Sequence, residues 1–292
     1  GEESGWSGKA YMGSSAILGK LKADDLALRN KRSGRTLAEA MASVGADVGS
    51  IAAGKPVPWV SGVRAYLELH IEQGPILEEE KVDIGVVTHG QGLKWLQVTL
   101  TGKEAHTGST PMPKRRNASL GMARGIELVH EVAMDYQPDA VGAVGHIQVW
   151  PNSRNIIAGK AVFTIDIRSP NKQVLDEMDE RIRYGIQNTA EALDIGFEVE
   201  QDGHFDPVTF DKTLVGNIRE AAKELGYSYR DIVSGAGHDA CWINRVAPSA
   251  MIMCPCVDGL SHNEAEEISK EWAAAGTDVL LRAVLETAEI VG

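Results

Sequence analysis

The sequence has few basic residues, few cysteines and no long apolar run, and each shortage excludes a class of protein. Lys and Arg number 29 against 41 Asp and Glu, which makes the formal net charge -12. Nonspecific nucleic-acid binding needs clustered Lys and Arg, and the one basic cluster, "PKRRNA", is short. No apolar run approaches the roughly 18 residues that span a bilayer. We therefore expect a soluble globular protein that binds neither nucleic acid nor membrane.

The three cysteines are odd in number and do not form a disulfide framework, which favours a reducing, cytoplasmic compartment. Cys254 and Cys256 flank a proline. A Cys-x-Cys pair indicates a metal site only weakly, and two buried thiols at a strand end are the alternative. The start, "GEESGWSGKAYMGS", lacks the features of a signal peptide and has no initiator Met. We expect the chain to be part of a longer protein.

The order of periodic segments predicts an inserted domain. Thr36 and Glu39 have the spacing of a capping box before a short helix that ends at Gly45. The stretch 94–202 then follows the order βαββαβ, the split βαβ or ferredoxin-like arrangement, which can bury its own core. Its predicted strands are 94–102, 141–150, 159–170 and 195–201, and its predicted helices are 117–136 and 171–193.

The segments on either side of this stretch predict one further domain of the α/β class. Residues 1–90 and 209–292 form this domain, and residues 91–208 form the inserted βαββαβ domain. The flanking elements are a strand over 81–88, a helix over 211–226, an apolar strand over 248–254 and a long amphipathic helix over 263–291.

Polar residues lie at the ends of these predicted elements, where a rigid scaffold presents them to a pocket. His70, in "ELHIEQGP", ends an apolar alternating segment, where a histidine is more often a core residue than a ligand. His262 follows an apolar strand and directly precedes a helix, either as a neighbour of the helix cap or at the location where open sheets bind ligands. Glu2 and Glu3 are adjacent and point either to two different partners or into solvent.

The inserted domain and the "GAGHDACW" turn supply further candidates. His106 stands at the end of the insert's first strand, and Asn155 lies in a loop. Arg168, at a strand end, is either a fork for a substrate carboxylate or an exposed charge. Gly237 and His238 lie in a tight turn that either approaches a ligand or only reverses the chain. Together these residues suit a cleft between two domains.

Several blocks in one order carry a resemblance to a known family. They are similar to the hydantoinase/carbamoylase branch of the dinuclear-metal aminoacylase and carboxypeptidase-like amidohydrolases, which includes N-carbamoyl-L-amino-acid hydrolases, allantoate amidohydrolases and β-ureidopropionases. The resemblance covers nearly the whole chain. It implies a metallopeptidase-like catalytic domain, an inserted lid and dimerisation domain, and a homodimer. The blocks are "AYLELHIEQGPILE", "IGVVT", "GKEAHTGSTPM", "PNSRNIIAGKAVFTIDIR", "SGAGHDA" and "GLSHNEAE".

The resemblance also implies roles for individual residues. Glu2 is implied to be the general base that activates a metal-bound water, and His106 to stabilise the oxyanion. Glu3, His70 and His262 are implied to be metal ligands. The residues implied to bind or lie near the substrate are Gln73, Asn155, Arg168, Gly237 and His238, and Arg168 among them grips the substrate carboxylate.

The implied chemistry uses two divalent metal ions, Zn, Mn, Co or Ni. They lower the pKa of a bridging water and polarise the scissile carbonyl, while a carboxylate moves the proton to the leaving nitrogen. Carbamoyl hydrolysis releases carbon dioxide and ammonia. The family's upstream His-x-Asp block does not occur in this sequence, so three of the usual five ligands are expected here.

The function predicted from these observations is metal-dependent hydrolysis of a linear amide or ureido C–N bond. The expected substrate is an N-carbamoyl-L-amino acid or a related ureido acid such as allantoate or β-ureidopropionate. One alternative is an aminoacylase or dipeptidase that uses the same metals. Another is an inactive fragment that acts only as a folded dimerisation module.

Overall fold

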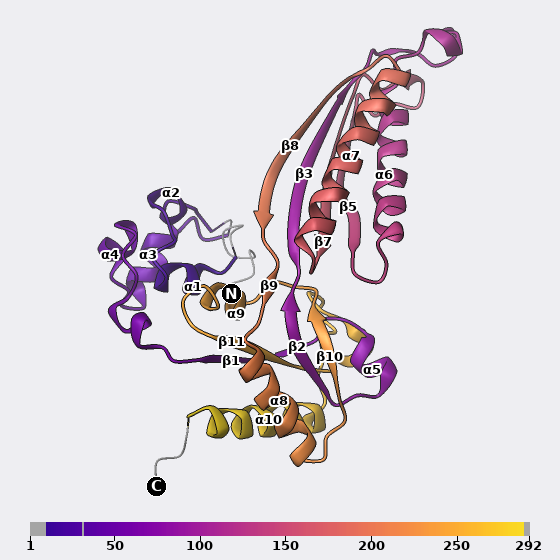
Figure 1. Ribbon diagram of the computed structural model, residues 1–292. Coiled ribbons are helices and arrows are strands. Elements are labelled where there is room, and N and C mark those ends of the chain that lie inside the picture. The colour runs from indigo at the N-terminus through magenta and orange to yellow at the C-terminus, as the bar shows by residue number, and fades with distance from the viewer. Residues whose placement is uncertain (1–9, 31, 289–292) are drawn as a thin grey trace. The chain divides into compact units, whose positions relative to one another are not determined.

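The structure is a computed structural model that describes residues 10–30 and 32–288, and it divides into two compact units (Figure 1). One unit, which we call the insert, is the continuous stretch 89–208. The other is discontinuous in sequence, because residues 1–88 and 209–292 form it together. We call this second one the split unit.

The insert is a four-stranded antiparallel sheet with two helices packed against it. Its strand order is β5-β7-β3-β8. The predicted order βαββαβ is confirmed, and α6 and α7 contact both each other and the sheet (Figure 1). A separate two-stranded sheet joins β4 (Ala105–His106) to β6 (Ile156–Ile157). The six main elements are β3 (Gly92–Thr101), α6 (Ala118–Asp135), β5 (Val141–Trp150), β7 (Lys160–Ser169), α7 (Lys172–Ala192) and β8 (Gly196–Phe205).

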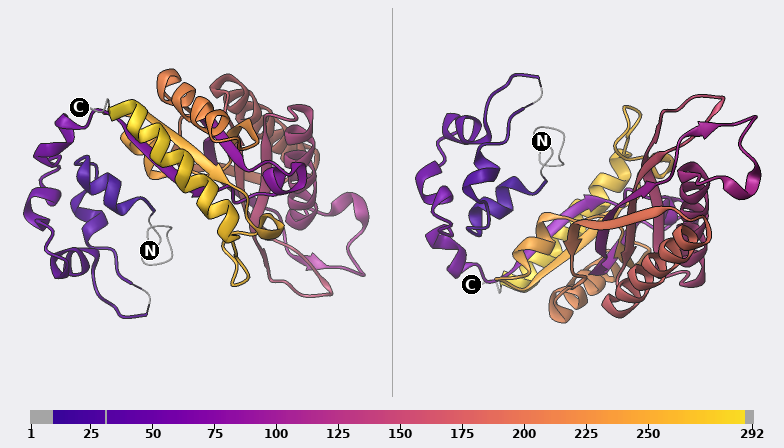
Figure 2. Two further views of the ribbon diagram at one scale, coloured as in Figure 1. Left: turned by 90° about the horizontal axis from the view of Figure 1, so that it is seen from below. Right: turned by 90° about the horizontal axis from the view of Figure 1, so that it is seen from above.

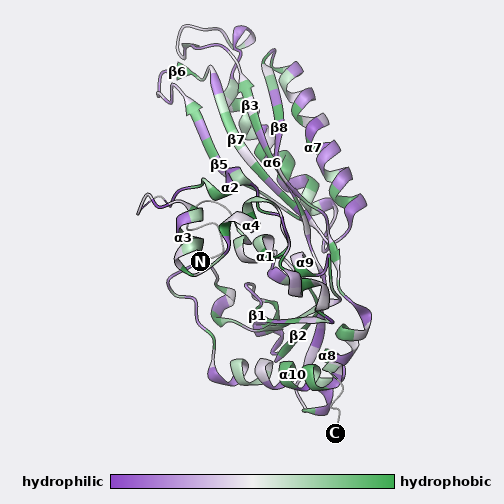
Figure 3. Cartoon of the chain, turned by 90° about the vertical axis from the view of Figure 1, so that its left-hand side faces the viewer, coloured by the Kyte–Doolittle hydropathy of each residue, from purple (hydrophilic) through white to green (hydrophobic). Residues whose placement is uncertain are grey.

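Alternation along β3 determines which face of this sheet the helices cover. Leu96 and Leu100 are buried in the same apolar core as residues of α6 and α7, whereas Trp95 keeps 47% of its surface exposed. Figure 3 shows hydrophilic residues recurring along α7, as expected of a helix with one buried stripe. Each helix begins at an asparagine, Asn117 or Asn171, whose side chain accepts backbone N–H bonds.

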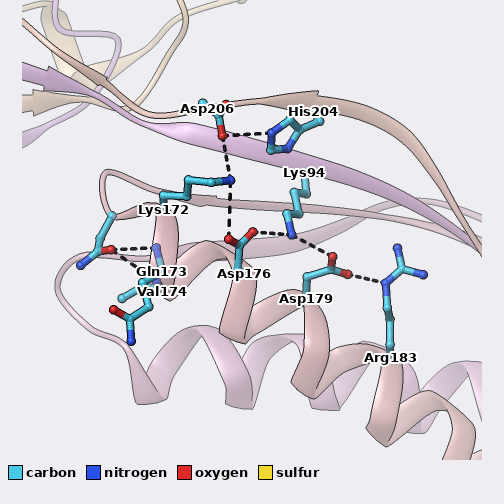
Figure 4. A network of polar contacts seen from close by, with 10 residues as sticks. Lys94, Lys172, Gln173, Val174, Asp176, Asp179, Arg183, His204 and Asp206 are labelled. Carbon is cyan, nitrogen blue, oxygen red and sulfur yellow. Dashed lines mark hydrogen bonds and ion pairs between the residues drawn. The ribbon is translucent and has the colours of Figure 1, made fainter.

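A buried charge cluster fastens α7 to β3. Lys94 lies on the covered face of β3, and its side chain is 10% exposed. Its Nζ lies 2.8 Å from Asp176 Oδ1 and 2.9 Å from Asp179 Oδ2 (Figure 4). Arg183 Nε also donates to Asp179 Oδ1, at 2.6 Å. The lysine is tolerated under the helix because each buried charge has an opposite partner.

The split unit contains a mixed sheet with the order β1-β11-β2-β10, and β9 pairs with β2. β1 runs parallel to β11, and β2 runs antiparallel to it. β11 is buried along its whole length, and α8 and α10 pack against it (Figure 2). The elements are β1 (Tyr66–Ile71), β2 (Ile84–Gly90), β9 (Val208–Thr209), α8 (Lys212–Glu224), β10 (Tyr229–Ser234), β11 (Ser249–Cys254) and α10 (Lys270–Ala288).

Short helices precede β1, and the sequence predicted only one of them, α3. Thr36 Oγ1 accepts the N–H of Glu39 at 3.1 Å, and the Glu39 carboxylate accepts the N–H of Thr36 at 2.8 Å, so the capping box is confirmed. No helix within residues 10–30 and 32–288 has the length and apolar content that crossing a membrane requires. The short helices of the unit are α1 (Met12–Ile17), α2 (Ala23–Leu26), α3 (Leu37–Ser43), α4 (Val48–Ala52), α5 (Ile76–Glu80) and α9 (Asp239–Ile243).

The C-terminal helix begins later than predicted, at Lys270 and not at residue 263. The Asn263 side chain accepts the N–H two residues further on, at 2.9 Å, which closes a turn. Ser269 Oγ then accepts the N–H three residues further on, at 3.1 Å, and starts the helix. His262 therefore precedes a turn, and the prediction that it directly precedes a helix was wrong.

The cysteines are free and buried. Cys254 ends β11, and its Sγ lies 3.2 Å from the carbonyl oxygen of Trp272, to which the thiol donates. Burial raises the pKa of Cys254 to about 11, so the thiol stays protonated at neutral pH. Cys256 is also buried. The interpretation of this pair as buried thiols at a strand end is confirmed.

Candidate active site

The acids of the segment 68–73 serve as helix caps. Glu68 Oε2 accepts the N–H of Ala240, at the start of α9, at 2.7 Å. The carboxylate of Glu72 accepts two N–H groups from the first turn of α5, at 2.9 and 2.7 Å. A helix leaves its first N–H groups without backbone partners, and both acids satisfy such groups. These roles were missed at the sequence level, where neither acid was assigned one.

His70 lies on β1, and one hydrogen bond sets its tautomer. Its Nδ1 lies 2.8 Å from the carbonyl oxygen of Ile71. A carbonyl oxygen only accepts, so Nδ1 carries the hydrogen and the neutral ring keeps a lone pair on Nε2. Metal-binding histidines are commonly oriented by such a bond from the other ring nitrogen. The local geometry therefore suits His70 as a ligand.

His238, the residue before α9, packs against His70. The two ring centroids are 4.4 Å apart, with 59° between the ring planes. The His238 side chain is only 2% exposed. Burial, and to a smaller extent the nearby His70, lowers the pKa of His238 to about 3. The ring is therefore neutral at pH 7, and its Nε2 has no hydrogen-bond partner among the described residues.

Glu68 lies beside this pair of rings. Its Oε1 is 3.9 Å from His238 Nδ1, which is too long for a hydrogen bond, and the contact is no ion pair because the imidazole is neutral. Burial raises the pKa of Glu68, and the hydrogen bond from Ala240 opposes that shift. Residues 66, 68 and 70 share one face of β1, so the two-residue period could have identified Glu68 from the sequence.

The turn after β1 brings Gln73 to the loop that carries His262. Gln73 Nε2 donates to Ser261 Oγ at 2.8 Å, across 188 positions of the sequence. Gln73 and His262 both have positive φ values, 57° and 56°. The His262 side chain is exposed, and its backbone N–H donates to Glu266 Oε2 at 3.2 Å. Ser261 was not among the predicted site residues.

Gly237 is explained by packing within the split unit. A side chain at this position would overlap the hydroxyl of Tyr11. The glycine therefore permits the close approach of Tyr11, and this accounts for it without a ligand.

In the insert, His106 and Asn155 lie side by side. His106 belongs to the short strand β4, and the prediction that it ends the insert's first strand was wrong, because β3 already ends at Thr101. The backbone N–H of Thr107 donates to the carbonyl oxygen of Asn155 at 2.9 Å. The Asn155 side chain accepts a hydrogen bond from Ser153 at 3.0 Å.

The tautomer of His106 is the reverse of that of His70. Its Nδ1 accepts the backbone N–H groups of Gly108 and Ser109, at 3.1 and 3.2 Å. A ring nitrogen that accepts carries no hydrogen, so the neutral ring keeps its hydrogen on Nε2. The side chain is exposed. His106 therefore offers a hydrogen-bond donor to a ligand.

Arg168 lies far from these two residues within the insert. Its guanidinium forms a two-pronged contact with Asp166, with Nε–Oδ1 3.0 Å and Nη2–Oδ2 2.7 Å. β5 and β7 pair from Val141–Arg168 at one end to Trp150–Lys160 at the other. Arg168 lies eight positions along the strand from Lys160, about 26 Å at roughly 3.3 Å per residue. Asn155 follows Trp150 beyond that far end, where Figure 3 shows β6.

The described residues provide part of a metal site at most. Within residues 10–30 and 32–288, no three or more His, Cys, Asp or Glu side chains are grouped so that they could hold a metal ion. His70 suits one ligand position, and the predicted ligand Glu3 and general base Glu2 lie outside the described residues. No catalytic step through a metal follows from the described residues alone.

The comparisons with known proteins agree with the predicted resemblance. The profile of peptidase family M20/M25/M40 matches residues 1–286. The chain is 64% identical over 229 residues to N-carbamoyl-L-amino-acid amidohydrolase of Rhizobium meliloti, covering 78% of this chain and 55% of that protein. It is 37% identical over 220 residues to the enzyme of the same name from Paenarthrobacter aurescens, covering 75% of this chain and 53% of that protein. The chain thus spans about half the length of these relatives.

A solved structure agrees with the fold. The crystal structure of an amidase of the hydantoinase/carbamoylase family from Burkholderia multivorans superposes with a TM-score of 0.86 at 43% sequence identity. The alignment covers 98% of this chain and 68% of that one.

Proposed function

Because the chain belongs to peptidase family M20/M25/M40, we propose that the complete protein hydrolyses the linear C–N bond of an N-carbamoyl-L-amino acid or a related ureido acid. The names of two relatives, N-carbamoyl-L-amino-acid amidohydrolases at 64% and 37% identity, support a carbamoyl substrate. The reaction would release the amino acid, carbon dioxide and ammonia. Allantoate and β-ureidopropionate belong to the same substrate class.

The observation that carries this proposal is the opposite tautomers of His70 and His106. Attack on a carbamoyl carbon moves negative charge onto its oxygen, and a hydrogen-bond donor stabilises that charge. We assign this role to the Nε2–H of His106, which two backbone N–H groups hold in the required tautomer. The lone pair on His70 Nε2 suits a metal ligand instead.

Members of this family generally use divalent metal ions. When bound, such ions polarise a carbonyl group and make a water molecule more acidic. We propose two ions, of Zn, Mn, Co or Ni, with His70, His262 and Glu3 among the ligands and Glu2 as general base. The last two assignments rest on the resemblance, since both residues lie outside the described ranges. A cytoplasmic location completes the proposal, supported by three free, buried cysteines.

We assign the substrate carboxylate to Arg168, whose planar fork matches a carboxylate. A ureido acid is much shorter than the roughly 26 Å of strand between Arg168 and the His106 end of the insert. One substrate therefore cannot contact both residues of a single insert. This separation supports a homodimer in which His106 and Asn155 of one chain serve a substrate held by Arg168 of its partner.

The free edge of β5 is the surface that we propose for this dimer. β5 has no Asp, Glu, Lys or Arg, and it exposes Val141, Ile147 and Trp150. The opposite edge, β8, carries three acids over 198–202, which discourage strand pairing. The substitution Ile147→Lys should convert the dimer to a monomer, as measured by light scattering. The equivalent change on β8, Phe197→Lys, should leave the molar mass unchanged; the reverse result would place the interface on β8.

The proposed activity is tested on the complete protein that contains this chain. Bound metal is first measured by elemental analysis after purification without chelator. Ammonia and free amino acid are then quantified after incubation with N-carbamoyl-L-alanine and with N-acetyl-L-alanine. Equal amounts of ammonia and alanine from the carbamoyl substrate are expected. Alanine from the acetyl substrate alone would indicate an aminoacylase, and no metal with no product would indicate an inactive dimerisation module.

A further inference from the structure

The turn 106–110 closes on the side chain of the histidine that begins it. The N–H of Thr110 donates to the carbonyl oxygen of His106 at 3.1 Å. Within this turn, the N–H groups of Gly108 and Ser109 donate to the Nδ1 atom of the same histidine at 3.1 and 3.2 Å. The tautomer of His106 therefore depends on the direction in which these backbone groups point.

Arg115 binds the carbonyl groups of this turn. Its Nη2 donates to the carbonyl oxygen of Thr107 at 2.6 Å, and its Nε donates to the carbonyl oxygen of Thr110 at 3.0 Å. The guanidinium group is planar and rigid, so the two donors keep a fixed spacing and hold both carbonyl groups at once. Arg115 is partly buried, whereas its neighbour Arg116 is exposed.

One peptide unit connects Arg115 to His106. The C=O of Thr107 and the N–H of Gly108 belong to the same peptide unit, which is trans, so the two groups point in opposite directions. Arg115 holds this unit at its C=O, and His106 Nδ1 holds it at its N–H. Turning the unit over would break both hydrogen bonds and bring the C=O towards the ring.

The alternative orientation of this peptide unit would reverse the histidine. A carbonyl oxygen only accepts, so beside Nδ1 it would favour the tautomer with the hydrogen on Nδ1 and a lone pair on Nε2. Gly108 lacks the Cβ atom that restricts φ, so the chain can adopt this orientation. The contact with Arg115 therefore selects between two orientations that the turn would otherwise permit.

We propose that Arg115 is a positioning residue, which holds the peptide unit between Thr107 and Gly108 so that His106 keeps its hydrogen on Nε2. The use of this hydrogen in catalysis rests on the proposed function, but the effect of Arg115 on the tautomer does not. Arg115 acts through the backbone of the turn and then through His106, without contacting the substrate.

The neighbouring Arg116 serves as a comparison. Its Nη2 donates to Asp194 Oδ1 at 3.2 Å, so its charge is paired with a carboxylate. A cavity of about 350 Å³ lies beside Arg115 and Thr107, and no Asp or Glu of the described part of the chain lines it. Arg115 is thus directed to carbonyl groups, and water in this cavity can solvate them when the guanidinium group is removed. We therefore expect the fold to tolerate the loss of Arg115.

The test compares Arg115→Met, which has an unbranched side chain without a hydrogen-bond donor, with Arg116→Met in the complete protein. Histidine labelled with a nitrogen isotope shows by NMR which ring nitrogen carries the hydrogen. The signals of His106 are those missing from His106→Phe. In the wild type and in Arg116→Met, the hydrogen of His106 should be on Nε2. In Arg115→Met, both ring nitrogens should give signals between those of the protonated and unprotonated states.

Steady-state kinetics with N-carbamoyl-L-alanine measure the consequence for catalysis. The value of kcat should fall about tenfold in Arg115→Met, the cost of about one hydrogen bond, with KM and bound metal unchanged. Arg115→Lys retains a donor that reaches one carbonyl group and should recover part of this loss. Arg116→Met should leave kcat unchanged.

The NMR measurement separates this inference from the proposed function. A wild-type protein with the His106 hydrogen on Nδ1, or an unchanged tautomer in Arg115→Met, would overturn the inference. The same shift in Arg116→Met would also overturn it, because loss of charge would then be sufficient. If Arg115→Met does not fold, Arg115→Ala replaces it.

Two further outcomes concern the proposed function. A shifted tautomer with unchanged kcat would support the inference and remove His106 from the catalytic residues. If the wild type hydrolyses no carbamoyl compound, the proposed function fails, and the tautomers of the wild type and Arg115→Met still decide the inference.

Discussion

His70 in the split unit and His106 in the insert present the same side chain in opposite states. His70 gives its Nδ1 hydrogen to a carbonyl oxygen and retains a lone pair on Nε2. His106 accepts two N–H groups at Nδ1 and retains a hydrogen on Nε2. His70 is half-buried on a strand, whereas His106 is exposed. The comparison teaches that the neighbouring backbone decides whether a histidine donates an electron pair or a hydrogen bond.

The largest effect is expected for His70→Phe, which keeps a ring but removes both nitrogens. Loss of a proposed metal ligand should lower kcat/KM for N-carbamoyl-L-alanine by more than ~10³-fold and reduce the bound metal. Steady-state kinetics and elemental analysis of the complete protein measure both quantities. If the variant retained its metal and its turnover, His70 would not be a metal ligand, and the proposed difference in role between His70 and His106 would be wrong.

His106→Phe should lower kcat by ~10²- to 10³-fold, the cost of one oxyanion donor, and should leave metal content unchanged. His130→Phe, at an exposed position on α6, is the matched control in the same unit and should change kcat little. Kinetics and elemental analysis are made on the same preparations. If His106→Phe also lost metal, His106 would be acting as a metal ligand, like His70, and not as a hydrogen-bond donor to the substrate.

The scaffold behind His106 depends on the buried ion pair of Lys94 with Asp179, and the half-exposed Asp176 makes a second contact with Lys94. Lys94→Ala leaves Asp179 buried without its lysine and should lower the free energy of unfolding by about 3 kcal/mol. Lys172→Ala removes a largely exposed partner of Asp176 and should have a much smaller effect. Urea unfolding of both variants measures the difference. Similar effects would mean that burial of Lys94 does not govern the stability of the insert.

The stability of the split unit around His70 should instead depend on pH, because His238 takes up a proton when the protein unfolds in acid. Its pKa is about 3 in the folded protein and about 6.5 when unfolded, so the unfolded state binds the proton between these values. Neutral His238 therefore contributes its full stabilisation above about pH 6.5. This contribution is lost as the pH falls towards 3, and the free energy of unfolding should be lower by about 2 kcal/mol at pH 5. His238→Leu should abolish this loss in metal-free protein, as measured by urea unfolding at pH 5 and 7.5. If the wild type and His238→Leu lose the same free energy of unfolding between pH 7.5 and pH 5, His238 is not the group that makes the protein sensitive to acid.

The insert was well predicted because its elements are long and strongly periodic. β5 spans Val141–Trp150 as expected, and α6 and α7 begin at the predicted asparagines. Periodicity works there because one face of each element is buried against a single core. The short helices α1, α2 and α4 were not predicted, since segments of four to six residues hold too little periodic signal.

The candidate site was predicted less completely, because its contacts join distant parts of the chain. Glu68 caps α9 from 172 positions away, and Ser261 binds Gln73 from 188 positions away. No local pattern indicates such partners. The late start of α10 was missed because the apolar period of the helix says nothing about the turn at Asn263.

By itself, the sequence determined the class of fold, the βαββαβ insert, the family and the list of polar residues around which a site is built. These follow from local periodicity and from ordered motifs, both of which are properties of neighbouring residues. Only the tertiary structure decided the tautomers of His70 and His106, the neutral state of His238 and the orientation of the Gln73 amide. Each depends on which backbone or side-chain atom lies within about 3 Å, or on exclusion of water, and both arise only when the chain is folded.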